Sequence, residues 1–220
     1  MSYIYKFESF VSENKFDYTL GDINNILKER NIHVTNLDYL DSGAYGNAFK
    51  LNENLVLKIT TSDSEVYYAS KLLNVNSNYL VNIKDVFFHE YFDMGYNVRN
   101  GFIIMEYLNT DRRKFNRFID YLHVHNPISD RYENVPMVEV INYFKDRLVG
   151  VDDEVIIEMF NYYKDIRKEL EKYNLPHDDL RGSNIGYRNN RPIFFDISSI
   201  YSSEKYDYSN IEIINTEIKL

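Results

Sequence analysis

The spacing of apolar residues changes near residue 108 of this 220-residue chain. Between Leu37 and Tyr107, short apolar stretches are broken by turn residues, which is the pattern of an antiparallel sheet. Beyond Leu108, apolar residues recur at helical intervals of three and four. A run of strands followed by a run of helices predicts an α+β architecture.

The first part is predicted to hold a sheet interrupted by one helix, from about Asp63 to Leu73. Strands are expected over Leu37–Ser42, Asn47–Asn52, Leu55–Thr60, Val81–His89 and Gly101–Tyr107, with a tight turn at Asn52–Asn54 and a looser one over Phe92–Asn100.

The second part is predicted to be mainly helical, with helices over Met137–Leu148 and Glu154–Tyr173. Pro176 ends the second helix, because proline disfavours helical geometry in the residue before it. The apolar runs Asn184–Tyr187 and Pro192–Ile197 then predict a hairpin that turns over residues 188–191.

Three ranges follow for the organisation of the chain. Residues 1–36 are predicted to be an N-terminal extension with a helix over Asp22–Arg30, residues 37–107 the sheet domain, and residues 108–220 the mainly helical domain. The role of residues 1–36 and of residues 199–220 stays open at this point, as does the oligomeric state.

Composition restricts the classes of function. A net charge of −9 provides no basic face, so neither nucleic acid nor membrane is an expected partner. No stretch approaches the roughly 18 apolar residues of a membrane span, and the N-terminus lacks a secretory signal, so a cytoplasmic location is expected. The absence of cysteine excludes disulfides and thiolate chemistry, and it favours magnesium over zinc for any metal site.

The most informative segment runs from Leu175 to Ser198 and combines a polar loop with the predicted hairpin. It carries His177, Asp179, Leu180 and Asn184 in the spacing His-x-Asp-Leu-x-x-x-Asn, with Asp196 twelve residues beyond Asn184. In these positions it resembles the catalytic loop and metal-binding loop of protein kinases and of their aminoglycoside phosphotransferase and RIO-type relatives. A polar loop whose aspartates only cap turns has a similar composition.

This resemblance implies a two-lobed, protein-kinase-like fold with a reduced helical lobe, and a phosphotransferase that uses ATP and Mg²⁺. Asp179 would accept the proton of the attacking hydroxyl, and Arg181 would face the transferred phosphate. Asn184 and Asp196 would provide the hard oxygen ligands that Mg²⁺ prefers.

A glycine-containing turn between the first two predicted strands resembles the phosphate loop of kinases. Its glycines match the second and third positions of the family's glycine motif, whereas Asp41 replaces the first. An ordinary hairpin has the same pattern. The residues expected against the nucleotide are Gly43, Ala44, Gly46 and Ala48.

The strand Val56–Ile59 resembles the kinase strand whose lysine, here Lys58, pairs with nucleotide phosphates. The expected partner of Lys58 is Glu65 on the following helix, with Asp63 as the second candidate. Gly101–Leu108 resembles the last sheet strand and hinge, which implies nucleotide contacts by Met105, Glu106 and Leu108.

The resemblance leaves the acceptor open. Asp178 stands where many regulated kinases carry an arginine, Ile197 and Ser198 replace Phe-Gly, and only 24 residues follow Asp196. A minimal Ser/Thr protein kinase acting on a protein hydroxyl is the first hypothesis. The alternatives are a small-molecule kinase of the aminoglycoside phosphotransferase type and a nucleotide-binding pseudokinase that acts through protein interaction, and transfer of AMP would use the same metal ligands.

Overall fold

The computed structural model describes residues 18–43, 45–93, 95–111, 113–122, 127–198 and 205–215. The chain forms two compact units, neither of them continuous in sequence. Unit 1 comprises Met1–Val66, Lys84–Tyr107 and Tyr208–Leu220, and unit 2 comprises Tyr67–Ile83 and Leu108–Asp207. The three predicted ranges therefore do not map one to one onto these units.

Unit 1 is built on a six-stranded sheet with the order β1-β2-β3-β5-β4-β8. The pairs β1/β2, β2/β3 and β3/β5 are antiparallel. The strand bounds are β1 Asp38–Ser42, β2 Gly46–Lys50, β3 Leu55–Thr60, β4 Ile83–Asp93, β5 Tyr96–Glu106 and β8 Glu212–Asn215.

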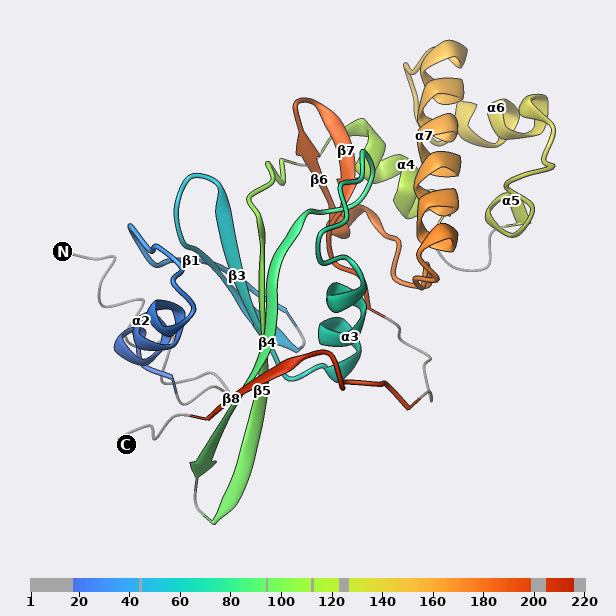
Figure 1. Cartoon of the computed structure of the whole chain (residues 1–220). Coiled ribbons are helices and arrows are strands. Elements are labelled where there is room, and N and C mark those ends of the chain that lie inside the picture. The colour runs from blue at the N-terminus through green and yellow to red at the C-terminus, as the bar shows by residue number, and fades with distance from the viewer. Residues whose placement is uncertain are drawn as a thin grey trace. The chain divides into compact units, whose positions relative to one another are not determined.

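Strand β8 comes from the far end of the chain and was not predicted. It pairs in parallel with β4, so that Phe87 lies opposite Glu212 and Glu90 lies opposite Asn215. Figure 1 shows this red segment beside the green β4 strand. The described part of residues 199–220 therefore includes the edge of the sheet.

Helix α2, Leu20–Glu29, packs its apolar side into the core of unit 1. Thr19 caps it, because its hydroxyl accepts from Asp22 N while the Asp22 carboxylate accepts from Thr19 N, a reciprocal capping box. The buried side chains Ile23, Ile26 and Leu27 join Phe49, Leu51, Leu57, Phe87 and Phe102 in one cluster. The predicted N-terminal helix thus contributes to the core on which the sheet is built.

Helix α3, Asp63–Lys71, begins directly after β3. Only Thr61 and Ser62 connect the two elements, and Figure 1 shows α3 following the strand after this short connection. This short connection fixes where the first turn of α3 stands relative to β3.

Unit 2 consists of helices and a two-stranded hairpin. Phe118 and Phe144 stack at its core with ring centroids 4.2 Å apart, and Phe160 and Ile166 of α7 are also buried. The bounds are α4 Lys114–Leu122, α5 Pro127–Asp130, α6 Met137–Lys145, α7 Asp153–Lys172, the short 3-10 helix η1 Gly182–Asn184, β6 Ile185–Arg188 and β7 Arg191–Phe194.

The predicted α+β class is confirmed by the order of elements: after α2, three strands, a helix and two more strands precede the remaining helices and the hairpin. The predicted turn over Phe92–Asn100 is wrong, because β4 continues to Asp93 and β5 already begins at Tyr96. Phe92 and Tyr96 are large apolar residues that are exposed, so the order of apolar and polar residues does not follow burial at this end of the hairpin. Within the described residues, no helix is both long and apolar enough to cross a membrane.

Candidate functional site

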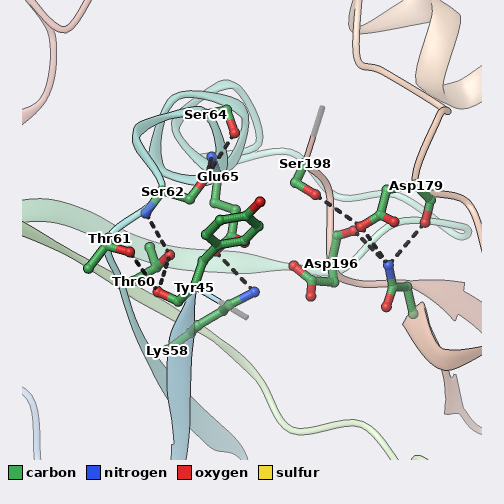
Figure 2. A network of polar contacts seen from close by, with 11 residues as sticks. Tyr45, Lys58, Thr60, Thr61, Ser62, Ser64, Glu65, Asp179, Asp196 and Ser198 are labelled. Atoms are coloured by element: carbon green, nitrogen blue, oxygen red, sulfur yellow. Dashed lines mark hydrogen bonds and ion pairs between the residues drawn. The ribbon is translucent and has the colours of Figure 1, made fainter. Parts of the chain in front are cut away.

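In unit 1, Lys58 and Glu65 form an ion pair. The Lys58 Nζ lies 3.0 Å from Glu65 Oε2, and the two side chains are 15% and 6% exposed. Figure 2 shows Lys58 reaching from the strand toward Glu65 on the helix. The structure thus brings together the two residues that sequence reasoning paired.

The position of Glu65 follows from the way α3 starts. Ser62 N donates to Thr60 Oγ1 at 3.0 Å, and Glu65 N donates to Ser62 Oγ at 3.4 Å (Figure 2). A serine hydroxyl that accepts from the first turn is a usual helix cap. Asp63, the second candidate for Lys58, instead accepts from Arg99 Nη2 at 2.7 Å.

The glycine turn is closed by a hydrogen bond from Gly43 N to Gly46 O at 2.8 Å. A side chain at Gly46 would place its Cβ 2.2 Å from Ile59 O, so the close approach of β2 to β3 requires glycine there. The Tyr45 carbonyl accepts from Thr61 N at 2.8 Å, which attaches the turn to the end of β3 (Figure 2). Ala44 lies outside the described residues.

The remaining predicted nucleotide residues of unit 1 lie on β2 and β5. Ala48 stands directly opposite Lys58 in the β2/β3 ladder. Met105 is buried and pairs with Val56, and Glu106 pairs with Leu55. Leu108, predicted for the same hinge, belongs to unit 2, where it is buried.

In unit 2, the hairpin brings Asn184 and Asp196 together. Ile185 pairs with Phe194 at the open end of the hairpin, so the residues flanking this pair lie close to each other. Phe195 N donates to Asn184 O at 3.0 Å, and Asn184 Nδ2 lies 3.5 Å from Asp196 O. The opposite end is the predicted turn, where Asn189 and Asn190 both have positive φ, as a type I′ turn requires.

The Asp179 carboxylate accepts hydrogen bonds from three side chains. Asn184 Nδ2 and Ser198 Oγ each lie 3.0 Å from Asp179 Oδ2, and Arg181 forms an ion pair with Oδ1. Figure 2 shows Asp196 and Ser198 on the segment beside Asp179. Asp179 is buried, whereas the Arg181 side chain is 41% exposed. The arrangement orients the carboxylate, which a proton acceptor requires.

Helix α4 holds the loop that follows Asp179, and sequence reasoning missed this support. Asn116 Nδ2 donates to Gly182 O at 2.7 Å and to Ile185 O at 3.0 Å, while Asp120 Oδ1 accepts from Gly182 N at 2.7 Å. A Cβ at Gly182 would lie 2.2 Å from Asn116 O, so the contact requires glycine. The sequence signal for this support was the pair Asn116 and Asp120. These two polar residues stand four positions apart on a helix whose residues Phe115, Phe118 and Ile119 are buried.

Ser198 was also missed as a site residue. Its hydroxyl donates to Asp179, yet in the sequence it appeared only as a replacement of the family's glycine. A single serine in a loop carries no pattern of its own, so no sequence signal was available.

The residues present fit a magnesium ion. The Asn184 amide nitrogen is turned toward the Asp179 carboxylate and carbonyl, and Asp196, whose main-chain oxygen lies 3.5 Å from that nitrogen, would add a carboxylate oxygen as a ligand. No cluster of three or more histidine, aspartate or glutamate side chains suited to a metal occurs among the described residues. Mg²⁺ does not require one, because it commonly binds through one or two protein ligands together with substrate phosphates and water.

Comparison with protein-family models found no match, and no curated protein matched the chain either. Solved structures with a similar fold were found. A complex of gentamicin with APH(2″)-IIa is 17% identical, with a TM-score of 0.38, over 83% of this chain and 72% of that one. The ADP-bound aminoglycoside phosphotransferase APH(2″)-Ib is also 17% identical, with a TM-score of 0.34, over 82% of this chain and 72% of that one.

A protein kinase is similar as well. The MAP kinase LmaMPK10 from Leishmania major is 18% identical, with a TM-score of 0.41, and the match covers 80% of this chain but 49% of the kinase. At such identities the likeness concerns the fold alone.

Proposed function

We propose that the chain is a phosphotransferase that moves the γ-phosphate of ATP to a hydroxyl group in the presence of Mg²⁺. The observation that carries this proposal is the grouping of Asp179 with Asn184, Asp196 and Ser198 at the open end of the β6/β7 hairpin. The Lys58–Glu65 ion pair in unit 1 supports it independently. A loop that only joins two elements has no need to bury a carboxylate, because burying a charge costs free energy unless it is paired and hydrogen-bonded.

In the proposed reaction, an acceptor hydroxyl oxygen attacks the γ-phosphorus. A new O–P bond forms, the bond between the γ-phosphorus and the bridging oxygen breaks, and ADP leaves with the electron pair of that bond. Asp179 orients the hydroxyl and receives its proton. Asn184 and Ser198 hold the carboxylate in place for this step.

The reaction also requires that the negative charge of the nucleotide phosphates be neutralised. Lys58, held by Glu65, offers its ammonium to phosphate oxygens. Asn184 and Asp196 would hold the magnesium ion, which neutralises phosphate charge when it is bound. The Gly43–Gly46 turn would let phosphates approach the backbone closely, because Gly43 and Gly46 carry no side chain.

The proposed acceptor is a serine or threonine hydroxyl of a protein. It is supported by Arg181, which lies at Asp179 and is exposed enough to contact an incoming phosphate. A small-molecule hydroxyl is the second candidate, because β8 begins at Glu212 and so leaves only a short segment after Asp196 to support a peptide.

Purified protein incubated with γ-labelled ATP and Mg²⁺ tests the proposal, beside the variants Asp179→Ala and Asp196→Ala. The acceptors are a generic protein such as myelin basic protein or casein, a set of aminoglycosides, and water. We expect transfer by the wild type and its loss in both variants. Asp146→Asn, an exposed aspartate at the end of α6, is the matched control and should keep full activity.

The labelled product separates the alternatives. Label on protein supports a protein kinase, and label on an aminoglycoside supports a small-molecule kinase. Binding of Mg·ATP without transfer to any acceptor would favour a pseudokinase. A wild type that neither transfers label nor binds the nucleotide would refute the proposed function.

A further inference from the structure

The last described residues of the chain, 208–215, here called the C-terminal strap, are attached to unit 1 at several points. Residues 212–215 form β8 beside β4. Glu212 pairs with Arg30, which also binds both oxygens of Asp85 at 2.8 and 2.9 Å. Ile211 is buried. The strap is thus an integral part of the sheet.

The strap also contacts the residue that holds the start of α3. The ring of Tyr208 lies edge-on to that of Phe88, with centroids 5.4 Å apart. The guanidinium of Arg99 lies 4.4 Å from the Phe88 centroid and 5.3 Å from the Tyr208 centroid. A guanidinium packed against two aromatic rings is restricted in its orientation.

Arg99 in turn holds the first residue of α3. Its Nη2 donates to Asp63 Oδ2 at 2.7 Å, and Asp63 is the first residue of α3. Glu65, which pairs with Lys58, lies two residues further in the same turn. Contacts therefore run from Tyr208 through Arg99 to Asp63, and the first turn of α3 connects Asp63 to Glu65, the partner of Lys58.

A second contact holds α3 further along. Tyr206, two residues before the strap, packs against Tyr67 and Tyr68, with centroid distances of 4.9 and 5.9 Å. Lys71 of the same helix lies over both of these α3 rings, at 4.7 and 5.4 Å. The segment that leads into the strap thus contacts α3 directly through Tyr206, whereas the strap reaches the start of α3 only through Arg99.

We propose that Tyr208 and Arg99 are positioning residues: the C-terminal strap holds the first turn of α3 through them and so keeps Glu65 paired with Lys58. The consequence for phosphate binding rests on the proposed function, whereas the pairing itself does not. Loss of the Tyr208 ring frees Arg99, loosens Asp63 and weakens the Lys58–Glu65 pair without touching either residue of the pair.

The pairing is measured without nucleotide, by the rate at which limiting acetic anhydride acetylates Lys58, followed by mass spectrometry and normalised to exposed Lys168. An amine reacts only after it loses its proton, and a carboxylate at 3.0 Å opposes that loss. Glu65→Gln sets the scale, with an expected increase of about tenfold. Tyr208→Ala should raise the rate by about threefold to tenfold, while Tyr208→Phe, which keeps the ring, should stay near the wild type.

Tyr96→Ala is the matched control, because it removes a tyrosine that is 76% exposed on the same sheet. It should leave the Lys58 rate unchanged. If Tyr208→Ala does not fold, Asp63→Asn breaks the same path at a half-exposed residue and should produce the same increase. A Lys58 rate that rises in Glu65→Gln but not in Tyr208→Ala or Asp63→Asn would overturn the proposal, and so would no rise in Glu65→Gln.

Titration with Mg·ATP separates this inference from the proposed function. We expect Tyr208→Ala to bind Mg·ATP about fivefold more weakly, with Tyr208→Phe restoring the affinity. If the wild type does not bind Mg·ATP, the proposed function fails, and the acetylation rates still decide whether the strap holds the pair. If the wild type binds and Tyr208→Ala binds equally well while its Lys58 rate is unchanged, the inference fails and the proposed function stands.

Discussion

The two groups of predicted site residues are held in different ways. In unit 1, Lys58 and Glu65 come from a strand and from the helix that follows it directly, and one ion pair joins them. In unit 2, the Asp179 carboxylate accepts from three side chains that lie within 19 residues of it in the sequence.

This difference shows what each group depends on. The Lys58–Glu65 pair depends on where α3 begins, so residues far away in the sequence, such as Arg99, affect it. The Asp179 group depends on hydrogen bonds within its own loop and on the support of Asn116 and Asp120 from α4. We therefore expect substitutions in unit 1 to act through the placement of an element, and substitutions in unit 2 to act on the chemical step.

The largest expected effect is the loss of activity on substituting Asp179 of unit 2. Asp179→Asn keeps the shape of the side chain but removes the proton acceptor, so kcat should fall by about a thousandfold. Affinity for Mg·ATP should change little, because Asp179 is not proposed to hold the nucleotide. Steady-state kinetics and nucleotide titration measure the two quantities, and a variant that keeps more than about a tenth of wild-type kcat would contradict the role.

Breaking the Lys58–Glu65 pair of unit 1 should lower activity less than Asp179→Asn does, but it should destabilise the protein more. Lys58→Met should lower kcat/KM by about a hundredfold, because a cation for the phosphates is lost. It also removes the cation from Glu65, which is 6% exposed, at a cost of about 3 kcal/mol in the free energy of unfolding.

The double variant Lys58→Met/Glu65→Gln separates these two effects. It leaves no buried charge behind, so denaturant unfolding should show most of the stability restored while kinetics show no recovery of activity. If stability does not recover, the charge of Glu65 is not what Lys58 balances. If activity recovers, Lys58 is not needed as a cation for the phosphates.

A buried histidine, His89, should make the free energy of unfolding depend on pH. Burial, as the main cause, lowers the pKa of His89 from 6.5 to about 4, and its Nδ1 lies 2.8 Å from the Tyr18 hydroxyl oxygen. As the pH falls from 7.5 to 5, the unfolded chain binds a proton that the folded protein does not, so His89 should cost about 2 kcal/mol of stability. Below the folded pKa of about 4, this loss should level off.

Urea unfolding of the wild type and of His89→Gln at pH 7.5 and pH 5 measures this contribution. The glutamine cannot be protonated, so the variant should lose about 2 kcal/mol less than the wild type between the two pH values. Equal losses in both proteins would show that His89 is not the group responsible.

The smallest effect should come from Ser198→Ala. It removes one of the three donors to Asp179 and leaves Asn184 and Arg181 in place, so kcat should fall about fivefold, as expected for one hydrogen bond. Ser198→Thr, which keeps the hydroxyl, should recover most of the rate in the same assay. A fall as large as that of Asp179→Asn would mean that Ser198 does more than orient the carboxylate.

Much of the fold was predictable because the apolar pattern has the period of the elements that formed. β3 spans the predicted residues 55–60, and α7 deviates from its prediction by one residue at each end. The outer part of the β4/β5 hairpin was not predictable, since the aromatic residues Phe92 and Tyr96 are exposed there and hide the alternation between apolar and polar positions. Strand β8 was missed because four residues with one half-buried side chain form a strand only when β4 is beside them.

By itself, the sequence determined most of the Asp179 group, namely Arg181, Asn184 and Asp196, since they lie close together along the chain and the hairpin between Asn184 and Asp196 closes through its own turn. The hydrogen bond from Ser198 to Asp179 was decided by the structure. Only the tertiary structure decided which distant residues support the site, namely Asn116 and Asp120 under the loop and Arg99 at the start of α3. The physical reason is that a periodic pattern records burial along one element. A hydrogen bond between residues 62 positions apart, as between Asp120 and Gly182, leaves no period in the sequence.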